Sequence, residues 1–506
     1  MASGESIILG LTESVGALIQ LNYGEVSGMQ ELSSRRDVSA SFIFARLDRL
    51  TVWSLPALFI GVIGVGFLFT FFDIFDINVS FIQTCSNIVP GCSPMDANNY
   101  LGLPVVINLA GYVVGTLILS PISDRIGRKH MLMITMLLSG LGSLLTAVVN
   151  QYGWFVLARG VTGTGIGADL AIVNAYINEV APRQQRARYT SLIFVMSAVG
   201  AFLGIWLGLL LTTPKTPFPL GLPFALASAQ FGYGWRIMYL IGGLLALVGV
   251  LLRVQLPESP RWLVSQGRLE EANLVVANME MIAAKHGPLA PVHDLGLAEE
   301  SQSAMPYSEI FKNSLYVRRT ILLMLMWTFS YVTVYAYASG FTTLLSSLKY
   351  PPPEAGLIAS VGTVGFVLCA IVAAIFGEHL ERKLWMPISA LLTLIGGFLV
   401  ASSGANLALA MIGSMVTFFG FNLWIPIAYA WSTEHYPTRA RTTGFALVDG
   451  IGHLGGGIGI LVIAPLIPSL GVMPSFLIIN GGLVAGAVLA LFGIRTRGKR
   501  LEEISP

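Results

Sequence analysis

Glu179-Val-Ala-Pro-Arg-Gln-Gln-Arg-Ala-Arg188 occurs a second time, in outline, as Glu434-His-Tyr-Pro-Thr-Arg-Ala-Arg441. The offset between the two acidic residues is 434 − 179 = 255 residues, and the prolines of the two stretches have the same offset. Another matching pair, Asp124-Arg125 and Glu381-Arg382, lies 257 residues apart. Two acidic corners followed by basic residues at one offset predict that the chain consists of two similar halves.

Both corners follow a long apolar run, and similar runs occupy most of the chain. A helix needs about 20 apolar residues to cross the hydrocarbon core of a bilayer. Twelve runs approach or exceed that length, near 54–82, 100–122, 131–149, 153–179, 188–212, 234–255, 320–346, 354–377, 384–402, 405–432, 442–467 and 473–494. The sequence therefore predicts an all-α membrane protein with twelve transmembrane helices in two pseudo-symmetric six-helix halves.

The composition excludes a water-soluble globular protein. Of the 506 residues, 54% are hydrophobic and only 11% are charged, whereas soluble domains carry about 25% charged residues. The 55 glycines suit membrane helices, whose backbones approach closely at small residues. The net charge of +2 gives no indication of a nucleic-acid partner, so we expect a lipid bilayer and a small-molecule substrate as the partners.

The basic residues predict the orientation. With the first fifty residues placed inside, 25 of the 29 Lys and Arg residues fall on the inner side, three (Lys215, Arg236 and Lys349) on the outer side, and Arg159 within a span. This asymmetry follows the positive-inside rule. It predicts cytoplasmic termini in the plasma membrane, or in the inner membrane if the chain is bacterial.

The polar stretches predict the domain boundaries. We expect a cytoplasmic arm at 1–50, a first half at 51–255, a cytoplasmic linker at 256–319, a second half at 320–494 and a cytoplasmic tail at 495–506. A parallel repeat implies a pseudo-two-fold axis along the membrane normal, with the substrate cavity between the halves near the midplane.

The three cysteines predict no metal site. Cys85 and Cys92 lie in the first polar loop and Cys369 in an apolar run, without CxxC or Cys/His spacing. Cys85 and Cys92 could form a disulfide if their loop faces an oxidising compartment, and unpaired loop cysteines are the alternative.

Four stretches, taken in order, resemble a known family. They run from Gly115 to Lys129 (Gly-Thr-Leu-Ile-Leu-Ser-Pro-Ile-Ser-Asp-Arg-Ile-Gly-Arg-Lys), from Arg159-Gly160 to Pro182, from Pro257 to Leu263 (Pro-Glu-Ser-Pro-Arg-Trp-Leu), and from Glu434 to Arg441. They are similar to the signatures of the major facilitator superfamily and its sugar-porter-like branch. The resemblance implies an alternating-access transporter that is no enzyme, uses no cofactor beyond a coupling proton, and works as a monomer.

Two further motifs narrow the resemblance. Asp73-Ile-Phe-Asp76 and Gly165-Ile-Gly-Ala-Asp169 resemble motifs of aromatic-acid, nicotinate-type and phosphate proton symporters. Phosphate symporters carry an acidic residue about one turn after a tryptophan in span seven, where this chain has Tyr331 after Trp327. Classical sugar porters carry paired glutamines there, which are also missing. Both departures count against phosphate and an ordinary hexose.

The acidic residues within spans are candidates for proton coupling, because a charged side chain in a bilayer is costly and usually paired or functional. Asp73 and Asp76 are three apart and share a helical face. Two close carboxylates do not both ionise easily, which suits a coupling site; a cap or kink of span one is the alternative. We expect Asp76 to pair with Arg159, because the resemblance implies such a pair, and a static structural bridge is the other interpretation.

Two other groups have weaker support. Asp169 lies ten residues from Arg159, about 15 Å along a helix, so it is a second proton or substrate group or makes a polar contact with Asn174 or a neighbouring helix. Asp449 and His453 share a face of span eleven and could form a proton relay, although a packed or solvated histidine is the more common finding.

Charged residues at the inner helix ends predict a cytoplasmic gate. Exposed ion pairs contribute about 1 kcal/mol or less each, but a network can favour one access state. We expect a latch between the halves, with some members acting only as topology anchors. The candidates are Asp124, Arg125, Arg128, Glu179, Arg186, Arg188, Glu434, Arg439 and Arg441.

Aromatic side chains in spans seven and ten are candidates for substrate contacts, with packing between helices as the alternative. They are Trp327, Tyr331, Tyr335, Asn422 (the one amide in the set), Trp424 and Tyr429. We therefore expect a proton-coupled symporter of a small organic solute, either an organic acid or a sugar-like compound. An uncoupled facilitator or antiporter of the same fold, or a non-transporting membrane receptor, is the alternative; no HExxH or GxSxG motif indicates an enzyme.

Overall fold

The computed structural model describes residues 39–182, 186–212, 232–292, 307–377, 379–436 and 441–497, and within these ranges all regular structure is helical. Twelve helices there are long and apolar enough to cross a membrane. This confirms the predicted class and the predicted number of spans.

The first half contains six spans. The second of them continues through a π-helical turn, η2, into α6 without a break. The spans are α4 (Leu58–Ile88), α5 (Ala97–Val114) with η2 (Gly115–Leu119) and α6 (Ser120–Ile126), α7 (Arg128–Val148), α8 (Tyr152–Val180), α9 (Arg186–Thr212) and α10 (Gly234–Arg253).

The second half repeats this series with two interruptions. The predicted run 320–346 is divided into α14 (Ser314–Ala338) and the short α15 (Phe341–Ser347). The tenth span is divided at Trp424, because Pro426 lacks the amide hydrogen that a continuous helix needs. The other elements are α16 (Pro352–Phe376), η4 (Arg382–Leu384), α17 (Trp385–Ser402), α18 (Leu407–Leu423), α19 (Ile425–Glu434), α20 (Arg441–Ile463), η6 (Ala464–Leu466), α21 (Ile467–Leu470) and α22 (Val472–Leu491).

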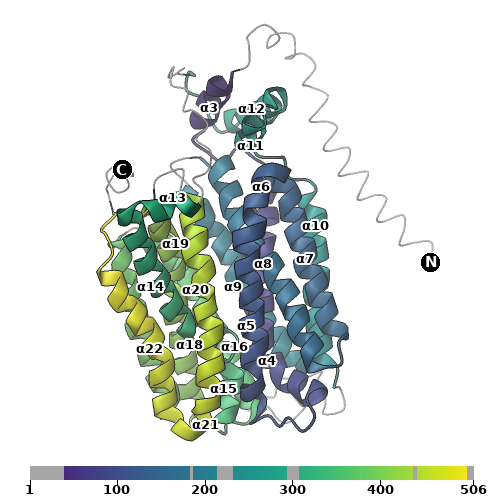
Figure 1. Cartoon of the computed structure of the whole chain (residues 1–506), viewed down its shortest axis with the longest axis vertical. Coiled ribbons are helices and arrows are strands. Elements are labelled where there is room, and N and C mark those ends of the chain that lie inside the picture. Colours follow the sequence, from purple (N-terminus) through teal and green to yellow (C-terminus); the bar gives the residue numbers. More distant parts are fainter. Residues whose placement is uncertain are drawn as a thin grey trace, which may run out of the picture.

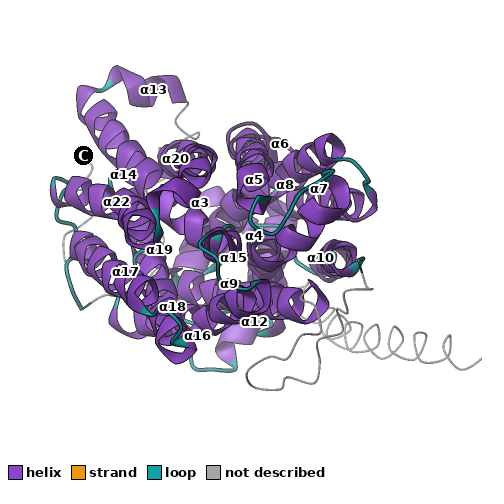
Figure 2. Cartoon of the chain, turned by 90° about the horizontal axis from the view of Figure 1, so that it is seen from below, coloured by secondary structure: helices purple, strands orange, loops and turns teal. Residues whose placement is uncertain are grey.

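The helix packing shows the repeat directly (Figures 1 and 2). In the first half α4 packs on α9 and α10, α8 on α5 and α7, and α7 on α10. In the second half α14 packs on α20 and α22, α18 on α16 and α17, and α17 on α22. The halves meet at two helix pairs, α5 with α20 and α9 with α16. Since α5 is equivalent to α16 and α9 to α20 in the repeat, the two pairs are equivalent to each other. Two six-helix halves related by a pseudo-two-fold axis explain both the matching packing within the halves and the matching helix pairs between them.

The two ends of the bundle differ. At one end, which we call the linker end, α11 (Pro260–Ser265) and α12 (Leu269–Ala284) lie beside α3 (Ala40–Asp48), with α13 (Tyr307–Lys312) near the second half (Figure 1). Arg46 of α3 and Arg49, which directly follows α3, both pair with Glu280 of α12, each at 2.6 Å. At the opposite end, the disulfide end, Cys85 in the last turn of α4 forms a disulfide with Cys92 in the loop that follows.

Small residues bring α5 and α8 together. A Cβ atom added at Gly163 would overlap the Asn108 carbonyl group, and one added at Gly167 would overlap the Tyr112 carbonyl group. The two backbones are therefore in direct contact, as small residues permit in membrane helices. This contact positions Arg159 and Tyr112, which belong to the sites described next.

Candidate functional site

Arg159 holds a buried carboxylate of span one, but the carboxylate is not the predicted one. Its Nη1 donates to Asp73 Oδ1 at 2.7 Å, and its Nη2 donates to the Asp73 backbone carbonyl at 3.1 Å. The expected pair with Asp76 is therefore wrong for this conformation. Asp73 offers the guanidinium two acceptors at once, which explains the choice of partner.

Asp76 is fully buried beside this pair. Neither of its carboxylate oxygens has a hydrogen-bond partner among the described residues. The Tyr239 hydroxyl is also without one, and its ring lies under the Arg159 guanidinium, 5.4 Å from the centroid. An ionised carboxylate without a partner carries a large desolvation cost, so this position suits a group that takes up and releases a proton.

Asp169 has a dedicated partner. Its carboxylate pairs with Arg253 at the end of α10, which is fully buried, and accepts a hydrogen bond from Thr135 of α7 at 2.9 Å. The expectation that Arg159 is the single basic residue buried in a span is wrong, because the last turn of α10 lies inside the bundle. The contact with neighbouring helices, weighed above as an alternative, is what the structure shows.

The predicted aromatic residues come together in the second half. The Trp327 ring centroid lies 4.7 Å from that of Trp424, 5.3 Å from Tyr429 and 5.1 Å from Tyr331. Tyr335 extends the cluster from Tyr331 at 5.7 Å. Asn422 is different: its described hydrogen bond is to the Phe418 carbonyl of its own helix.

Asp449 connects this cluster with the first half. It accepts hydrogen bonds from the Tyr331 hydroxyl at 2.7 Å and from the Tyr112 hydroxyl of α5 at 2.9 Å. The His453 ring stacks on the Tyr112 ring at 3.9 Å and lies 4.0 Å from the Tyr331 ring. Sequence reasoning singled out Asp449 and His453 but missed Tyr112, which has no charge or motif to distinguish it from other span aromatics.

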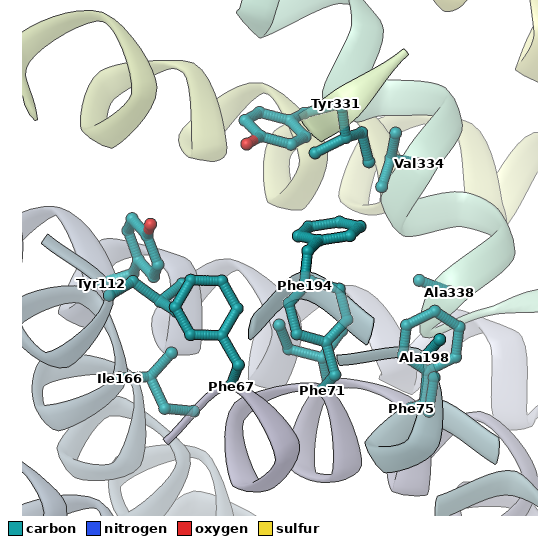
Figure 3. Packing of buried hydrophobic residues seen from close by; sticks show 14 of the residues in the cluster. Phe67, Phe71, Phe75, Tyr112, Ile166, Phe194, Ala198, Tyr331, Val334 and Ala338 are labelled. Atoms are coloured by element: carbon teal, nitrogen blue, oxygen red, sulfur yellow. The ribbon is translucent and has the colours of Figure 1, made fainter. Parts of the chain in front are cut away.

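A small cavity lies between the halves at this point. The first half contributes Tyr112, Thr116 and Asn174, and the second half contributes Tyr429, Phe445 and Asp449. Figure 3 shows the adjoining contact, with Phe71 and Phe194 of the first half facing Tyr331 and Val334 of the second. The cavity lies where the repeat predicts a substrate site.

The described gate residues form ion pairs within each half. Arg128 pairs with Asp124 at 2.5 Å and with Glu179 at 3.1 Å, and Arg382 pairs with Glu434. Each of these three pairs lies within one half, and the expected latch between the halves stays a prediction for the other candidates. Arg125 is exposed. Arg439 lies outside the described residues, as do the side chains of Arg186, Arg188 and Arg441.

Glu258 is a further member of this network that sequence reasoning missed as a site. Its carboxylate accepts from the backbone amides of Arg128 at 3.0 Å and Lys129 at 3.2 Å, and so caps the start of α7. Trp262 donates to the Asp124 carbonyl at 2.9 Å. The Pro257 to Leu263 motif could have indicated this role, since it lies at the start of the linker.

Hydrogen bonds join the halves in the middle of the bundle and at its disulfide end. In the middle, Tyr112 of α5 donates to Asp449 of α20. At the disulfide end, Asn78 of α4 donates to the carbonyls of Tyr337 and Ala338 and accepts from Thr342. The described conformation is thus closed on the disulfide side of the cavity.

Comparisons with known proteins agree with this architecture. Residues 47–506 match the family described as "Sugar (and other) transporter". The putative metabolite transport protein YyaJ of Bacillus subtilis is 26% identical over 90% of this chain and 96% of its own length. The niacin transporter NiaP of Acinetobacter baylyi is 24% identical over 91% and 99%. The 4-hydroxybenzoate transporter PcaK of Pseudomonas aeruginosa is 28% identical over 79% and 84%.

A solved structure has the same fold. The partially occluded inward open conformation of the xylose transporter XylE from E. coli superposes with a TM-score of 0.67 at 20% identity, covering 91% of this chain and all of that one.

Proposed function

The chain belongs to the sugar (and other) transporter family of the major facilitator superfamily, and from this premise we propose that it moves a small organic solute across the membrane together with protons. The family places it among transporters of metabolites, and not among enzymes. The coupling to protons and the nature of the solute are the parts that we propose.

One observation carries the proposal: Asp76 is buried without a hydrogen-bond partner, next to the Asp73–Arg159 pair. With a proton on Asp76, Arg159 stays with Asp73. Loss of that proton creates a second carboxylate on the same helical face, and both then compete for one guanidinium. Movement of Arg159 would disturb the contact of α4 with α8. The protonation state of Asp76 would in this way be coupled to the packing of these two helices.

The remaining features follow from the same scheme. We propose that the linker end faces the cytoplasm, in the plasma membrane or a bacterial inner membrane, and that a monomer is sufficient. The cavity lies between the halves and is closed toward the disulfide end, as alternating access requires of one of its states. A similar structure is titled a proton:xylose symporter, which supports coupling. For the solute, the expectation from the sequence stays an organic acid or a sugar-like compound.

The test uses purified protein in liposomes. Niacin, 4-hydroxybenzoate and D-xylose serve as first solutes, ranked by thermal shift, since a ligand that binds the native state raises its melting temperature. Wild-type protein should accumulate the best of them against its gradient when the outside is acidic, with alkalinisation outside. Asp76→Asn should lose accumulation and keep solute exchange.

Asp96→Asn, in the exposed loop after α4, is the matched control and should behave as wild type. If Asp76→Asn still accumulates solute, its coupling role is wrong. Uptake without any pH change would identify an uncoupled facilitator instead.

A further inference from the structure

The charged groups on the wall of the cavity between the halves indicate which kind of solute the cavity binds. Asp449 is the one acidic residue among the described residues that line this cavity, and none of them is Lys or Arg. The other polar groups on the wall are uncharged, namely the hydroxyls of Tyr112, Thr116 and Tyr429 and the side chain of Asn174. The wall therefore carries one carboxyl group and no Lys or Arg side chain.

Asp449 differs from the paired aspartates of the first half in the kind of partner that its carboxyl group has. Asp73 pairs with Arg159 at 2.7 Å, and Asp169 pairs with Arg253. Asp449 is equally buried, at 3% exposure, but accepts its hydrogen bonds from two tyrosine hydroxyls. Hydroxyl donors bring no positive charge, so no Lys or Arg of the cavity wall balances the ionised form of this carboxylate.

His453 is the titratable group that faces Asp449. Its Nδ1 lies 3.6 Å from the Asp449 carboxylate but 2.7 Å from the Asp449 backbone carbonyl. The shorter contact shows that the ring nitrogen is directed at the backbone. The imidazole ring stacks on Tyr112 and packs at a tilt against Tyr331, so His453 serves as part of an aromatic wall.

Aromatic side chains lie around the same carboxylate. Tyr112, Tyr429 and Phe445 line the cavity with Asp449, and Trp327 lies behind Tyr429 with 5.3 Å between ring centroids. Aromatic faces attract cations within about 6 Å of the ring centre, and aromatic cages are the usual binding sites of quaternary ammonium groups. A carboxylate together with such rings suits a positively charged nitrogen.

We propose that this cavity binds an organic cation, with Asp449 as its counter-ion and the surrounding rings as its cage. The inference rests on the proposed function and replaces the organic acid or sugar-like solute expected from the sequence, because a carboxylate-bearing compound would bring a second carboxylate to Asp449. Entry of a cation also competes with the Tyr112 hydroxyl for the carboxylate, and that hydrogen bond joins the halves. Binding of the solute is thereby linked to their separation.

The test compares three probes that share one pyridine ring and differ in charge: nicotinate (negative), nicotinamide (neutral) and 1-methylnicotinamide (positive). Their dissociation constants are measured by calorimetry on the purified full chain in lipid nanodiscs. We expect 1-methylnicotinamide to bind about tenfold or more tightly than nicotinamide, and nicotinate to bind most weakly. Choline and its uncharged analogue 3,3-dimethylbutanol form a second pair without a ring.

Variants of Asp449 test whether this residue causes the preference for the cation. Asp449→Asn keeps the hydrogen-bond acceptor and removes the charge, so it should bring the cation to the affinity of the neutral analogue. Asp449→Glu should keep the preference, which guards against a loss caused by misfolding, and Asp96→Asn is the surface control. Tighter binding of nicotinate, an unchanged preference in Asp449→Asn, or no binding of either cation overturns the inference.

The two proposals fail in different ways. If nicotinate is bound and accumulates with alkalinisation, and Asp76→Asn abolishes accumulation, the cation site is wrong and the proton-coupled transporter stands. If a cation binds through Asp449 but no solute moves with protons, the site stands and the coupling fails.

Discussion

At the scale of single residues, the Asp169–Arg253 pair shows how strongly two buried charges depend on each other. Both side chains are almost completely inaccessible, and Arg253 also donates to the Leu132 carbonyl at 2.7 Å. Removing one partner leaves the other as an uncompensated charge, whereas replacing both by apolar groups is often tolerated.

Arg253→Met should therefore lower the stability of the protein by about 3 kcal/mol or more, seen as a lower melting temperature in circular dichroism. The double variant Asp169→Leu/Arg253→Met should recover most of the loss. Glu271→Ala, which breaks the exposed Arg268–Glu271 pair, should change little. A double variant as unstable as the single one would show that the pair has a role beyond charge balance.

His435, next to the end of α19, predicts a pH dependence. Burial lowers the pKa of His435 from 6.5 to about 4, so the folded state favours the neutral ring. Unfolded chains bind the proton more readily, and stability is complete above pH 6.5 and lost as the pH falls toward 4. The full effect is about 3 kcal/mol.

In thermal unfolding followed by circular dichroism between pH 7.5 and 5, wild-type protein should lose more stability than His435→Gln. His286→Gln, at an exposed histidine, should follow the wild type. Parallel curves for wild type and His435→Gln would contradict this assignment.

Sequence reasoning found the charged residues but not their partners. A charge within an apolar run is visible in one dimension, which is why Asp73, Asp76 and Arg159 could be predicted. The choice of Asp73 over Asp76 depends on where the guanidinium reaches a backbone carbonyl. Tyr112 stayed hidden because its role arises only when α5 meets α20 across the interface.

At the scale of elements, the contact between α5 and α8 depends on glycine at defined positions of α8. Gly163 faces the Asn108 carbonyl, whereas Gly153 of the same helix has open space around it. The two positions make a matched comparison within one helix.

Gly163→Ala should separate the two helices, lower the melting temperature and reduce the yield of monodisperse protein in size-exclusion chromatography. Gly153→Ala should be neutral or slightly stabilising, because alanine is the better helix former by up to about 1 kcal/mol. Equal behaviour of the two variants would show that α5 and α8 can shift at little cost.

Helix positions were predictable and their interruptions were less so. All twelve runs became spans, since hydrophobic length decides whether a segment crosses a bilayer. The division after Ala338 was missed, because the apolar run continues through Gly340 into α15. The caps that Glu258 provides for α7 are contacts between distant segments, which one-dimensional patterns do not contain.

At the scale of the whole molecule, Asn78 is a principal contact between the halves at the disulfide end. Its amide donates to two carbonyls, at 2.7 and 2.8 Å, and its oxygen accepts from the Thr342 amide and hydroxyl, at 3.0 and 2.6 Å. All four bonds cross from the first half to the second. Loss of this side chain should therefore favour opening on the disulfide side.

Asn78→Ala should increase the maleimide labelling rate of a cysteine placed at Ser346, which is buried in α15, by about tenfold, in a background with Cys369→Ala. Each lost hydrogen bond is worth about 1 kcal/mol. Asn87→Ala, at an exposed residue that bonds within α4, is the control. An unchanged labelling rate would mean that other contacts hold this end closed.

The repeat made the two halves predictable, and the structure corrects its register at the linker end. Glu179 pairs with Arg128 and Glu434 with Arg382, so the basic residues are 382 − 128 = 254 residues apart. This is one residue short of the offset of 255 between the glutamates, and it makes Arg128 the equivalent of Arg382 in place of Arg125. The sequence could not predict which access state the structure adopts, because the same residues form both states.

The contact between Trp327 and Trp424 also gives the protein an optical signal of its own. The two indoles lie 4.7 Å apart and are inaccessible to solvent, and Trp327 lies 5.3 Å from the ring of Tyr429, which lines the cavity. Indole emission depends on the polarity of its surroundings and on quenching by adjacent groups. Filling or opening of the cavity thus alters the ultraviolet fluorescence of the unmodified chain, and the transport cycle can be followed in time without a label.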